Sequence, residues 1–126
     1  MRLLLDTNVL LWWATEELRL STSARAAIGD TANWVAVSAA SIWELAIRRC
    51  ATGKLPSADS LAENVAEYGL QALPITQEPA WAAGRLPLHH RDPFDRMLVA
   101  QAQLEGLTLV TRDRKLARYQ VAILPA

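Results

Sequence analysis

Short apolar runs alternate along this chain with longer stretches of helical periodicity, and this alternation restricts the fold more than any other feature of the sequence. The first run, Arg2–Leu5, is mostly leucine, as expected for a strand covered on both faces, and a helical stretch follows it at once. Strands that alternate with helices pair in parallel, because each helix returns the chain across a face of the sheet. The sequence therefore predicts a three-layer α/β/α fold around a central parallel sheet of four to five strands.

The other elements are predicted from apolar periodicity and from residues that cap or end helices. After 2–5, the expected strands cover 34–37, 73–75, 107–110 and 121–124, and the proline in 73–75 places that strand at a sheet edge. The expected helices run from 7 to about 13, from 21 to about 29, from 38 to a stop at Gly53 or Pro56, from about 59 to 68, from 77 to 85 and from 92 to 106, with a helical turn over 114–119.

The helix that Ser38 caps carries apolar residues at three-and-four spacing, which is typical of one buried face. We expect that face to hold Ala39, Ile42, Trp43, Ala46, Ile47 and Cys50. Trp43 is accordingly expected in the core. We also interpret Cys50 as a small buried hydrophobe.

Composition indicates one compact domain, residues 1–126, with no global charge to attract a polyanion. The chain has 126 residues, of which 52% are hydrophobic, and its formal net charge is zero. A single cysteine excludes an internal disulfide and fits a reducing cytoplasm. The longest uncharged stretch, from Thr31 to Trp43, is well short of the roughly 20 residues that span a bilayer. We therefore expect a cytoplasmic protein that does not enter a membrane.

Four carboxylates interrupt apolar stretches at places where they can converge: Asp6, Glu44, Asp95 and Asp113. Asp6 and Asp113 come just after predicted strands, whereas Glu44 and Asp95 lie in the first turns of predicted helices. Ligands of open α/β sheets bind outside the carboxyl ends of the strands. We therefore expect all four acids on one rim of the sheet.

Each acid also has a simpler interpretation. Asp6 and Asp113 can cap the helices that follow them, worth about 1 kcal/mol each, and taken singly capping explains them as well as catalysis does. Asp92 and Asp95 approximate a capping box, and for Asp92 we prefer the capping role. Glu44 can pair with an arginine one turn later, Arg48.

Four converging acids are harder to explain by capping alone, because two like charges 4 Å apart cost about 4 kcal/mol at an effective dielectric of 20. A divalent cation offsets that repulsion, and a set of oxygen ligands favours Mg²⁺ or Mn²⁺. His89 and His90 offer nitrogen ligands, but adjacent side chains point in different directions, so we interpret both as polar loop contacts. The sequence therefore predicts a magnesium or manganese site made of carboxylates.

Three separated blocks resemble the PIN-domain family, and specifically its VapC-type toxin ribonucleases: LLLDTNVLLW, SAASIWELAIR and HRDPFDRMLVAQAQLEGLTLVTRD. The resemblance runs from Arg2 to the last predicted strand. It implies that the family's acidic quartet falls on Asp6, Glu44, Asp95 and Asp113. Thr7, Asn8 and Thr111 match positions that support such a site, and Asp92 is a possible helper.

The resemblance implies an endoribonuclease that acts as the toxin of a toxin–antitoxin pair. The quartet would hold one or two Mg²⁺ or Mn²⁺ ions that activate water for attack on RNA phosphodiesters. The expected partners are an RNA substrate, a cognate antitoxin and a second copy in a homodimer or larger toxin–antitoxin assembly. The candidate RNA-binding residues are Arg91, Arg96, Arg112, Arg114 and Lys115.

Two other classes of function stay open at this point. A haloacid-dehalogenase-type phosphatase also begins with a strand that ends in a catalytic aspartate, but it requires a second aspartate two residues later, where this chain has Asn8. A catalytically silent module that keeps the fold and binds an antitoxin is the other alternative, and the complete quartet argues against it.

Overall fold

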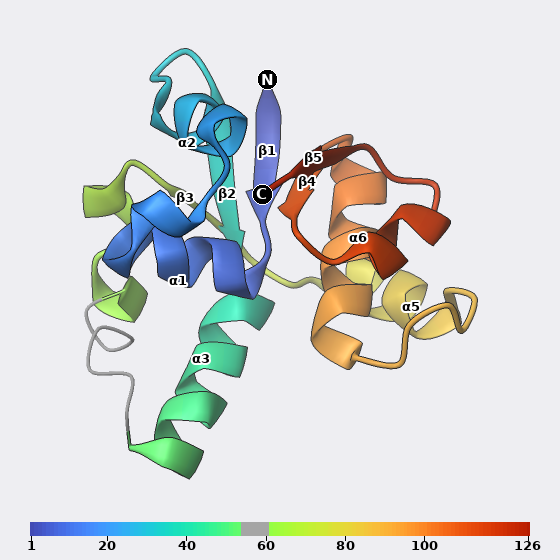
Figure 1. Cartoon of the computed structure of the whole chain (residues 1–126). Coiled ribbons are helices and arrows are strands. Elements are labelled where there is room, and N and C mark those ends of the chain that lie inside the picture. The colour runs from blue at the N-terminus through green and yellow to red at the C-terminus, as the bar shows by residue number, and fades with distance from the viewer. Residues whose placement is uncertain (54–60) are drawn as a thin grey trace.

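The computed structural model describes residues 1–53 and 61–126, and its centre is a five-stranded sheet in the order β3-β2-β1-β4-β5. All four strand pairs are parallel, so the predicted sheet is confirmed (Figure 1). The strands are β1 (Arg2–Leu5), β2 (Trp34–Ser38), β3 (Gln71–Leu73), β4 (Thr108–Thr111) and β5 (Ile123–Pro125).

Helices connect these strands at the predicted places. The α-helices are α1 (Thr7–Thr15), α2 (Thr22–Gly29), α3 (Ala39–Thr52), α5 (Gln77–Arg85) and α6 (Pro93–Glu105). Three 3₁₀ helices complete the described chain: η1 (Glu17–Arg19), η2 (Val65–Tyr68) and η3 (Arg114–Arg118). The predicted stop at Pro56 and the predicted helix start near Asp59 lie outside the described residues.

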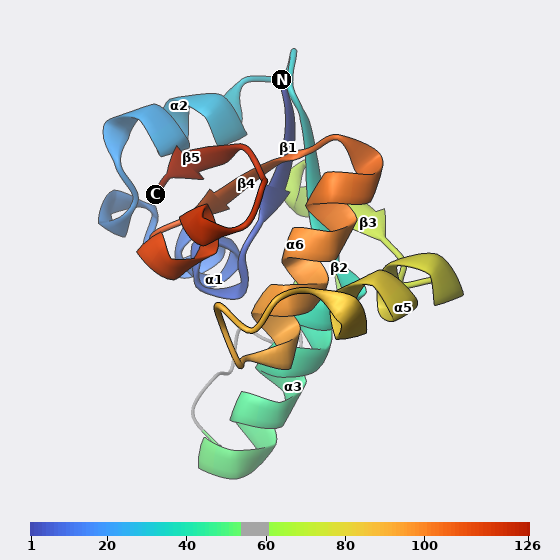
Figure 2. The same ribbon diagram turned by 90° about the vertical axis from the view of Figure 1, so that its right-hand side faces the viewer.

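The sheet is covered on both faces, which explains why its central strands are continuously apolar. Leu3 and Leu5 point to a core that α1, α2 and the start of α3 cover. Leu4 points the other way, into a core built on α6 and η3. Figure 2 shows α6 across this second face with α5 packed beside it. The three-layer prediction is therefore confirmed.

The two edge strands begin about two residues away from their predicted positions. β3 covers Gln71–Leu73, instead of 73–75, and β5 covers Ile123–Pro125 instead of 121–124. Pro74 cannot donate a ladder hydrogen bond, so β3 ends before it, and β3 is an edge strand as expected. Neither shift moves the strand ends that precede Asp6 and Asp113.

The prediction of a buried apolar face on α3 is wrong. Its buried side chains are Ala40, Ser41 and Leu45, whereas Trp43 is 62% exposed and Ile47 is 45% exposed. Cys50 is a free, exposed thiol. The cause is geometric, because α3 leaves the carboxyl end of β2 and extends away from the sheet, so only its first turns meet the core (Figure 1).

None of the described helices is long and apolar enough to cross a membrane. The carboxyl ends of β1, β2 and β4 lie at one edge of the parallel sheet, and α1, α3 and η3 begin there. The start of α6 faces the same edge in Figure 2. This edge carries the candidate site.

Candidate metal centre

Asp6 lies directly after β1 and caps α1. Its Oδ1 accepts a hydrogen bond from the backbone N–H of Val9 at 2.9 Å, and its Oδ2 accepts one from the Thr111 hydroxyl at 2.5 Å. The residue is only 7% exposed. Burial raises the pKa of Asp6, and the charge of Glu44 raises it further, although the hydrogen bonds from Thr111 and the backbone lower it. Asp6 is therefore both a helix cap and a buried acid that faces other acids.

Glu44 reaches the same edge from α3, where its side chain is 13% exposed. Its Oε2 pairs with Nη2 of Arg48 at 2.8 Å, and Nη1 of Arg48 donates to Oδ1 of Asn8, also at 2.8 Å. The predicted pairing with Arg48 is thus present, and it does not remove Glu44 from the cluster. Arg48 instead bridges α3 to α1 beside the acids.

Asp95 lies in the first turn of α6, and its pKa is raised to about 7. The largest cause is burial, followed by repulsion from Asp92 and Asp6, and Glu44 adds to it. Asp92 caps α6, as predicted, because its Oδ1 accepts from the backbone N–H of Phe94 at 2.8 Å and of Asp95 at 3.4 Å. Near neutral pH the Asp95 carboxyl is therefore about half protonated, unless a nearby positive charge offsets the repulsion from the other acids.

Asp113 follows β4 and caps η3 by accepting from the backbone N–H of Lys115 at 2.9 Å. Burial acts to raise its pKa, but the Lys115 backbone N–H, the ring of His90 and the charge of Lys115 outweigh burial, so the pKa is lowered. Thr111 connects Asp113 to Asp6, because its hydroxyl also accepts from the Asp113 backbone N–H at 3.1 Å. Asp113 is the most solvated and most readily ionised of the acids with a shifted pKa.

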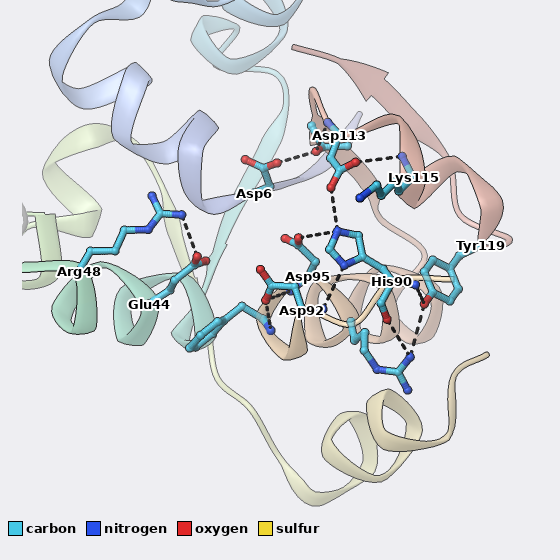
Figure 3. A network of polar contacts seen from close by, with 12 residues as sticks. Asp6, Glu44, Arg48, His90, Asp92, Asp95, Asp113, Lys115 and Tyr119 are labelled. Atoms are coloured by element: carbon cyan, nitrogen blue, oxygen red, sulfur yellow. Dashed lines mark hydrogen bonds and ion pairs between the residues drawn. The ribbon is translucent and has the colours of Figure 1, made fainter. Parts of the chain in front are cut away.

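The structure brings all four acids to one edge, as Figure 3 shows, with Glu44 on the far side of Asp6 and Asp95 from Asp113. Asp6, Glu44 and Asp95 are close enough that charge on one raises the pKa of another. On the other side, ligand atoms of His90, Asp95 and Asp113 all lie within 4.8 Å of one another. The donors are mainly carboxylate oxygens, which fits a hard divalent cation.

His90 is a loop residue with polar contacts, as expected, and its partners are two of the four acids, so it belongs to this cluster. Its Nε2 lies 2.9 Å from Oδ2 of Asp113 and 3.3 Å from Oδ2 of Asp95. Adjacent histidines do point differently, since His89 packs its ring edge against Tyr119 instead, with 5.1 Å between centroids. That divergence leaves His90 free to face the acids. The one signal in the sequence was its place two residues before the Asp92 cap.

Two of the predicted supporting residues fix the helices that carry the acids. The hydroxyl of Thr7 donates to Oγ of Ser41 at 3.1 Å in a buried contact between α1 and α3. Asn8 holds Arg48, as described above. These contacts fix the first turn of α1 against α3, and thereby Asp6 relative to Glu44.

Arg96 does not face RNA, so its prediction as an RNA-binding residue is wrong. It is 8% exposed, and its guanidinium donates to carbonyl oxygens of the last turn of α5 and of the loop after it: Ala83, Gly84, Leu86, Pro87 and His90. Orphan carbonyls at a helix end favour such a cation. Arg96 therefore shapes the loop that presents His90.

The other predicted basic residues are exposed: Arg91, Arg112, Arg114 and Lys115. Arg112 is held in place, with its guanidinium carbon 4.3 Å from the ring centre of Trp12 and with hydrogen bonds to the carbonyls of Arg19 and Ala126. The remaining three lie close to Asp113 or to the start of α6 in the sequence.

Comparison with known proteins decides the family. The family model for the PIN domain matches residues 3–122. The chain belongs to the PIN-domain family. Ribonuclease VapC22 from Mycobacterium tuberculosis is 38% identical to this PIN domain over 124 residues, which cover 93% of this chain and 91% of that protein. Because the chain belongs to the PIN-domain family, the alternative of a haloacid-dehalogenase-type phosphatase is set aside.

Solved structures agree with the fold. VapBC2 from Rickettsia felis bound to a promoter DNA fragment superposes with a TM-score of 0.76 at 17% identity, covering 99% of this chain and 98% of that chain. DNA-bound VapBC from Salmonella typhimurium gives a TM-score of 0.75 at 20% identity, with coverage of 99% and 98%. FitAcB from Neisseria gonorrhoeae gives 0.65 at 22% identity, with coverage of 97% and 96%.

Proposed function

We propose that this PIN domain is a divalent-metal-dependent endoribonuclease and the toxin of a toxin–antitoxin pair. The observation that carries the proposal is the convergence of four acids from four separate elements, with the pKa of Asp95 raised to about 7 by burial and by neighbouring acids. A fold alone does not need this arrangement, and a bound cation would offset the repulsion between the acids. Similarity to Ribonuclease VapC22 over nearly the whole chain supports RNA as the substrate.

The residues at this edge fit Mg²⁺ or Mn²⁺ because their donors are mainly carboxylate oxygens. We assign Asp6 and Asp95 as the principal ligands and Glu44 as the next, whereas Asp113 acts through water or a second ion. One or two such ions, when bound, supply a nucleophilic water at neutral pH and stabilise charge on the leaving oxygen. Cation binding also replaces the proton that Asp95 holds near pH 7.

The protein's own groups orient these ligands. Thr111 and the Val9 N–H leave little freedom to the Asp6 carboxylate, which is buried and doubly hydrogen-bonded. Arg48 neutralises part of the charge on Glu44. Four carboxylates with one divalent cation leave a charge near −2, so this guanidinium reduces the repulsion that an incoming phosphate meets.

Exposed cations beside the acids provide the approach for RNA. Arg114 and Lys115 follow Asp113, and Arg91 precedes α6. Since the net charge of the chain is zero, attraction of the phosphate backbone must come from this local group. RNA affinity should therefore decrease steeply with salt when these three charges are present.

Cleavage of a structured RNA by purified, antitoxin-free protein tests the proposal. Wild type should cleave in Mg²⁺ or Mn²⁺ and stop in EDTA, leaving 5′-phosphate and 3′-hydroxyl ends. Asp6→Ala and Asp95→Ala should lose about a hundredfold or more of the rate. Asp30→Ala, which removes an exposed turn acid, is the matched control. Cleavage in EDTA, full activity in both site variants, or no cleavage at all would contradict the proposal, and the last result favours a silent module.

We further propose that an antitoxin and a second copy of the chain cover the apolar surface of α3. Support comes from the exposure of Trp43 and Ile47, and from an adjacent hollow of 430 Å³ between α3, η2 and β3. The solved relatives from Rickettsia felis and Salmonella typhimurium are VapBC assemblies. Trp43→Ser should keep cleavage but resist antitoxin inhibition. Trp81→Ser, on α5, should behave like wild type, although Trp81 is at least as exposed as Trp43.

We propose that the 126 residues form one PIN domain that acts on cellular RNA in the cytoplasm. The exposed thiol of Cys50 is compatible with a reducing compartment. Fractionation of cells that carry the tagged protein tests this location, and recovery of the protein outside the cytoplasm would contradict it.

A further inference from the structure

Both ring nitrogens of His90 are engaged, and their partners differ in kind. Nδ1 lies 3.0 Å from the backbone nitrogen of Asp92. Nε2 lies 2.9 Å from Oδ2 of Asp113 and 3.3 Å from Oδ2 of Asp95. One side of the ring therefore meets a donor, and the other side meets two acceptors (Figure 3).

These partners fix the tautomer. A backbone N–H can only donate, so Nδ1 must offer its lone pair to Asp92 and carry no proton. The single proton of the neutral ring is then on Nε2, where it points at the carboxylate of Asp113, and the carboxylate of Asp95 lies beside it. A nitrogen that carries a proton in the ring plane has no lone pair left for a metal ion.

We propose that His90 is a positioning residue of the metal centre, which donates from Nε2 to Asp113 beside Asp95 and does not itself ligate the cation. This inference rests on the proposed function and adds a specific role to a residue outside the acidic quartet. It predicts that the oxygens of Asp113 and Asp95 are oriented before a cation arrives. Such partners behind metal ligands commonly contribute 10–100-fold in affinity.

The backbone of His90 is anchored more firmly than an ordinary loop requires. Its N–H donates to the hydroxyl of Tyr119 at 3.1 Å, and its carbonyl accepts from Nη1 of Arg96 at 3.3 Å. The Tyr119 hydroxyl donates in turn to the carbonyl of Pro87 at 2.7 Å. Tyr119 and Arg96 are 5% and 8% exposed, so both anchors are part of the interior. The ring therefore has little freedom to turn away from the acids.

A neutral donor suits this position better than a cation does. A lysine or arginine between Asp95 and Asp113 would compete with the metal for the same oxygens, whereas an imidazole N–H orients them without a full positive charge. The arrangement also keeps the ligand set all oxygen, which favours Mg²⁺ or Mn²⁺ over metals that prefer nitrogen.

Two variants separate the two ring nitrogens. His90→Gln places an amide N–H near the former Nε2 and keeps the donor to the carboxylates. His90→Asn places its side-chain oxygen near the former Nδ1, so it keeps the contact with the Asp92 N–H but loses the donor. The Mn²⁺ dissociation constant without RNA should rise about 10–100-fold in His90→Asn and stay within a few-fold of wild type in His90→Gln. His89→Asn is the control and should not change it.

Pulsed EPR of Mn²⁺ bound to wild type reports directly on nitrogen ligands of the cation. We expect no ¹⁴N coupling of the size that a directly bound imidazole produces. Such a coupling, if His90→Asn removes it, would show that His90 is a ligand and overturn the inference. Equal Mn²⁺ affinity in wild type and His90→Asn, with both proteins folded in EDTA by thermal melting, would overturn it as well.

Mn²⁺ binding and RNA cleavage together distinguish a failure of the ribonuclease proposal from a failure of the positioning role. If Mn²⁺ binds with the predicted dependence on His90 but RNA is not cleaved, the ribonuclease proposal falls and the positioning role stands. If RNA is cleaved and His90→Asn binds Mn²⁺ like wild type, the positioning role falls alone.

Discussion

The hydroxyl of Thr111 donates a 2.5 Å hydrogen bond to Oδ2 of Asp6, from the end of β4 to the end of β1. The same hydroxyl accepts the backbone N–H of Asp113 at 3.1 Å. One small side chain thus connects two of the four acids across neighbouring strands. The pairing register of β1 and β4 therefore also fixes where Asp6 and Asp113 lie relative to each other in the proposed metal site.

Replacement of Thr111 by valine keeps its shape and removes both hydrogen bonds. Because Asp6 is buried, its Oδ2 would lose its protein donor, which costs about 1–3 kcal/mol of unfolding free energy. We also expect kcat/KM for RNA to fall about 10–100-fold, since the ligand is no longer oriented. Urea unfolding and cleavage rates check both effects. Thr111→Ser retains the hydroxyl and should lie close to wild type, and equal losses in the two variants would contradict this role.

The raised pKa of Asp95 predicts how the metal-free protein responds to pH. The folded protein holds this proton up to about pH 7, whereas the unfolded chain loses it near its ordinary value of 3.8. Between these values unfolding releases a proton, so the unfolding free energy contributed by Asp95 decreases as pH rises. Each pKa unit corresponds to about 1.4 kcal/mol, so the decrease amounts to a few kcal/mol.

Thermal melting in EDTA at pH 5 and pH 8 measures this dependence. Wild type should lose more stability between the two values than Asp95→Asn, whose amide does not titrate. Added Mn²⁺ at pH 8 should restore stability to wild type by linkage, and much less to Asp95→Asn. If the melting temperatures of the two proteins change equally with pH, the titration of Asp95 does not cause the pH dependence.

Arg48 partly neutralises the charge on Glu44, so its removal should change the affinity for Mn²⁺ and the affinity for RNA in opposite directions. Without the guanidinium the site is more negative, so Arg48→Gln should bind Mn²⁺ about threefold to tenfold more tightly. The same change should raise KM for RNA, because the phosphate meets more repulsion. Isothermal titration and steady-state kinetics check the two directions. Arg49→Gln removes an equal charge from the next position, and an identical response in it would contradict a specific role for Arg48.

Arg96 should matter for folding and not for RNA contact. Arg96→Met leaves several carbonyls in the last turn of α5 and in the loop after it without their donor, and we expect a loss of about 2–4 kcal/mol in urea unfolding. Arg91→Met, at an exposed position, should change stability by less than about 0.5 kcal/mol and weaken RNA binding instead. A stable Arg96→Met protein with reduced RNA affinity would reverse this assignment.

The sequence was sufficient for the parts of the fold that depend on local patterns. β1, β2 and β4 are short apolar runs, and Asp92 with Pro93 is a strong start signal for α6, so these elements and the acids beside them are predictable. The periodicity of α3 is equally clear, but it does not reveal whether the apolar face meets this chain or another surface. That is why Trp43 was expected in the core.

The contacts of His90 and Arg96 could not be read from local patterns. His90 meets Asp113, 23 residues later, and Arg96 meets Ala83, 13 residues earlier. Both contacts depend on the path of the irregular loop that joins α5 to the start of α6, and such a loop has no periodicity. The acids were easier to place because each follows a strand or begins a helix at the same edge.

The position of the cation is the most direct test of the account. In crystals soaked with Mn²⁺, anomalous diffraction should show a peak about 2.0–2.3 Å from carboxylate oxygens of Asp6 and Asp95, with Glu44 facing it, and no peak there in Asp95→Asn crystals. If wild-type crystals bind Mn²⁺ only at other acids, such as the exposed Asp30, the four carboxylates do not form the metal centre.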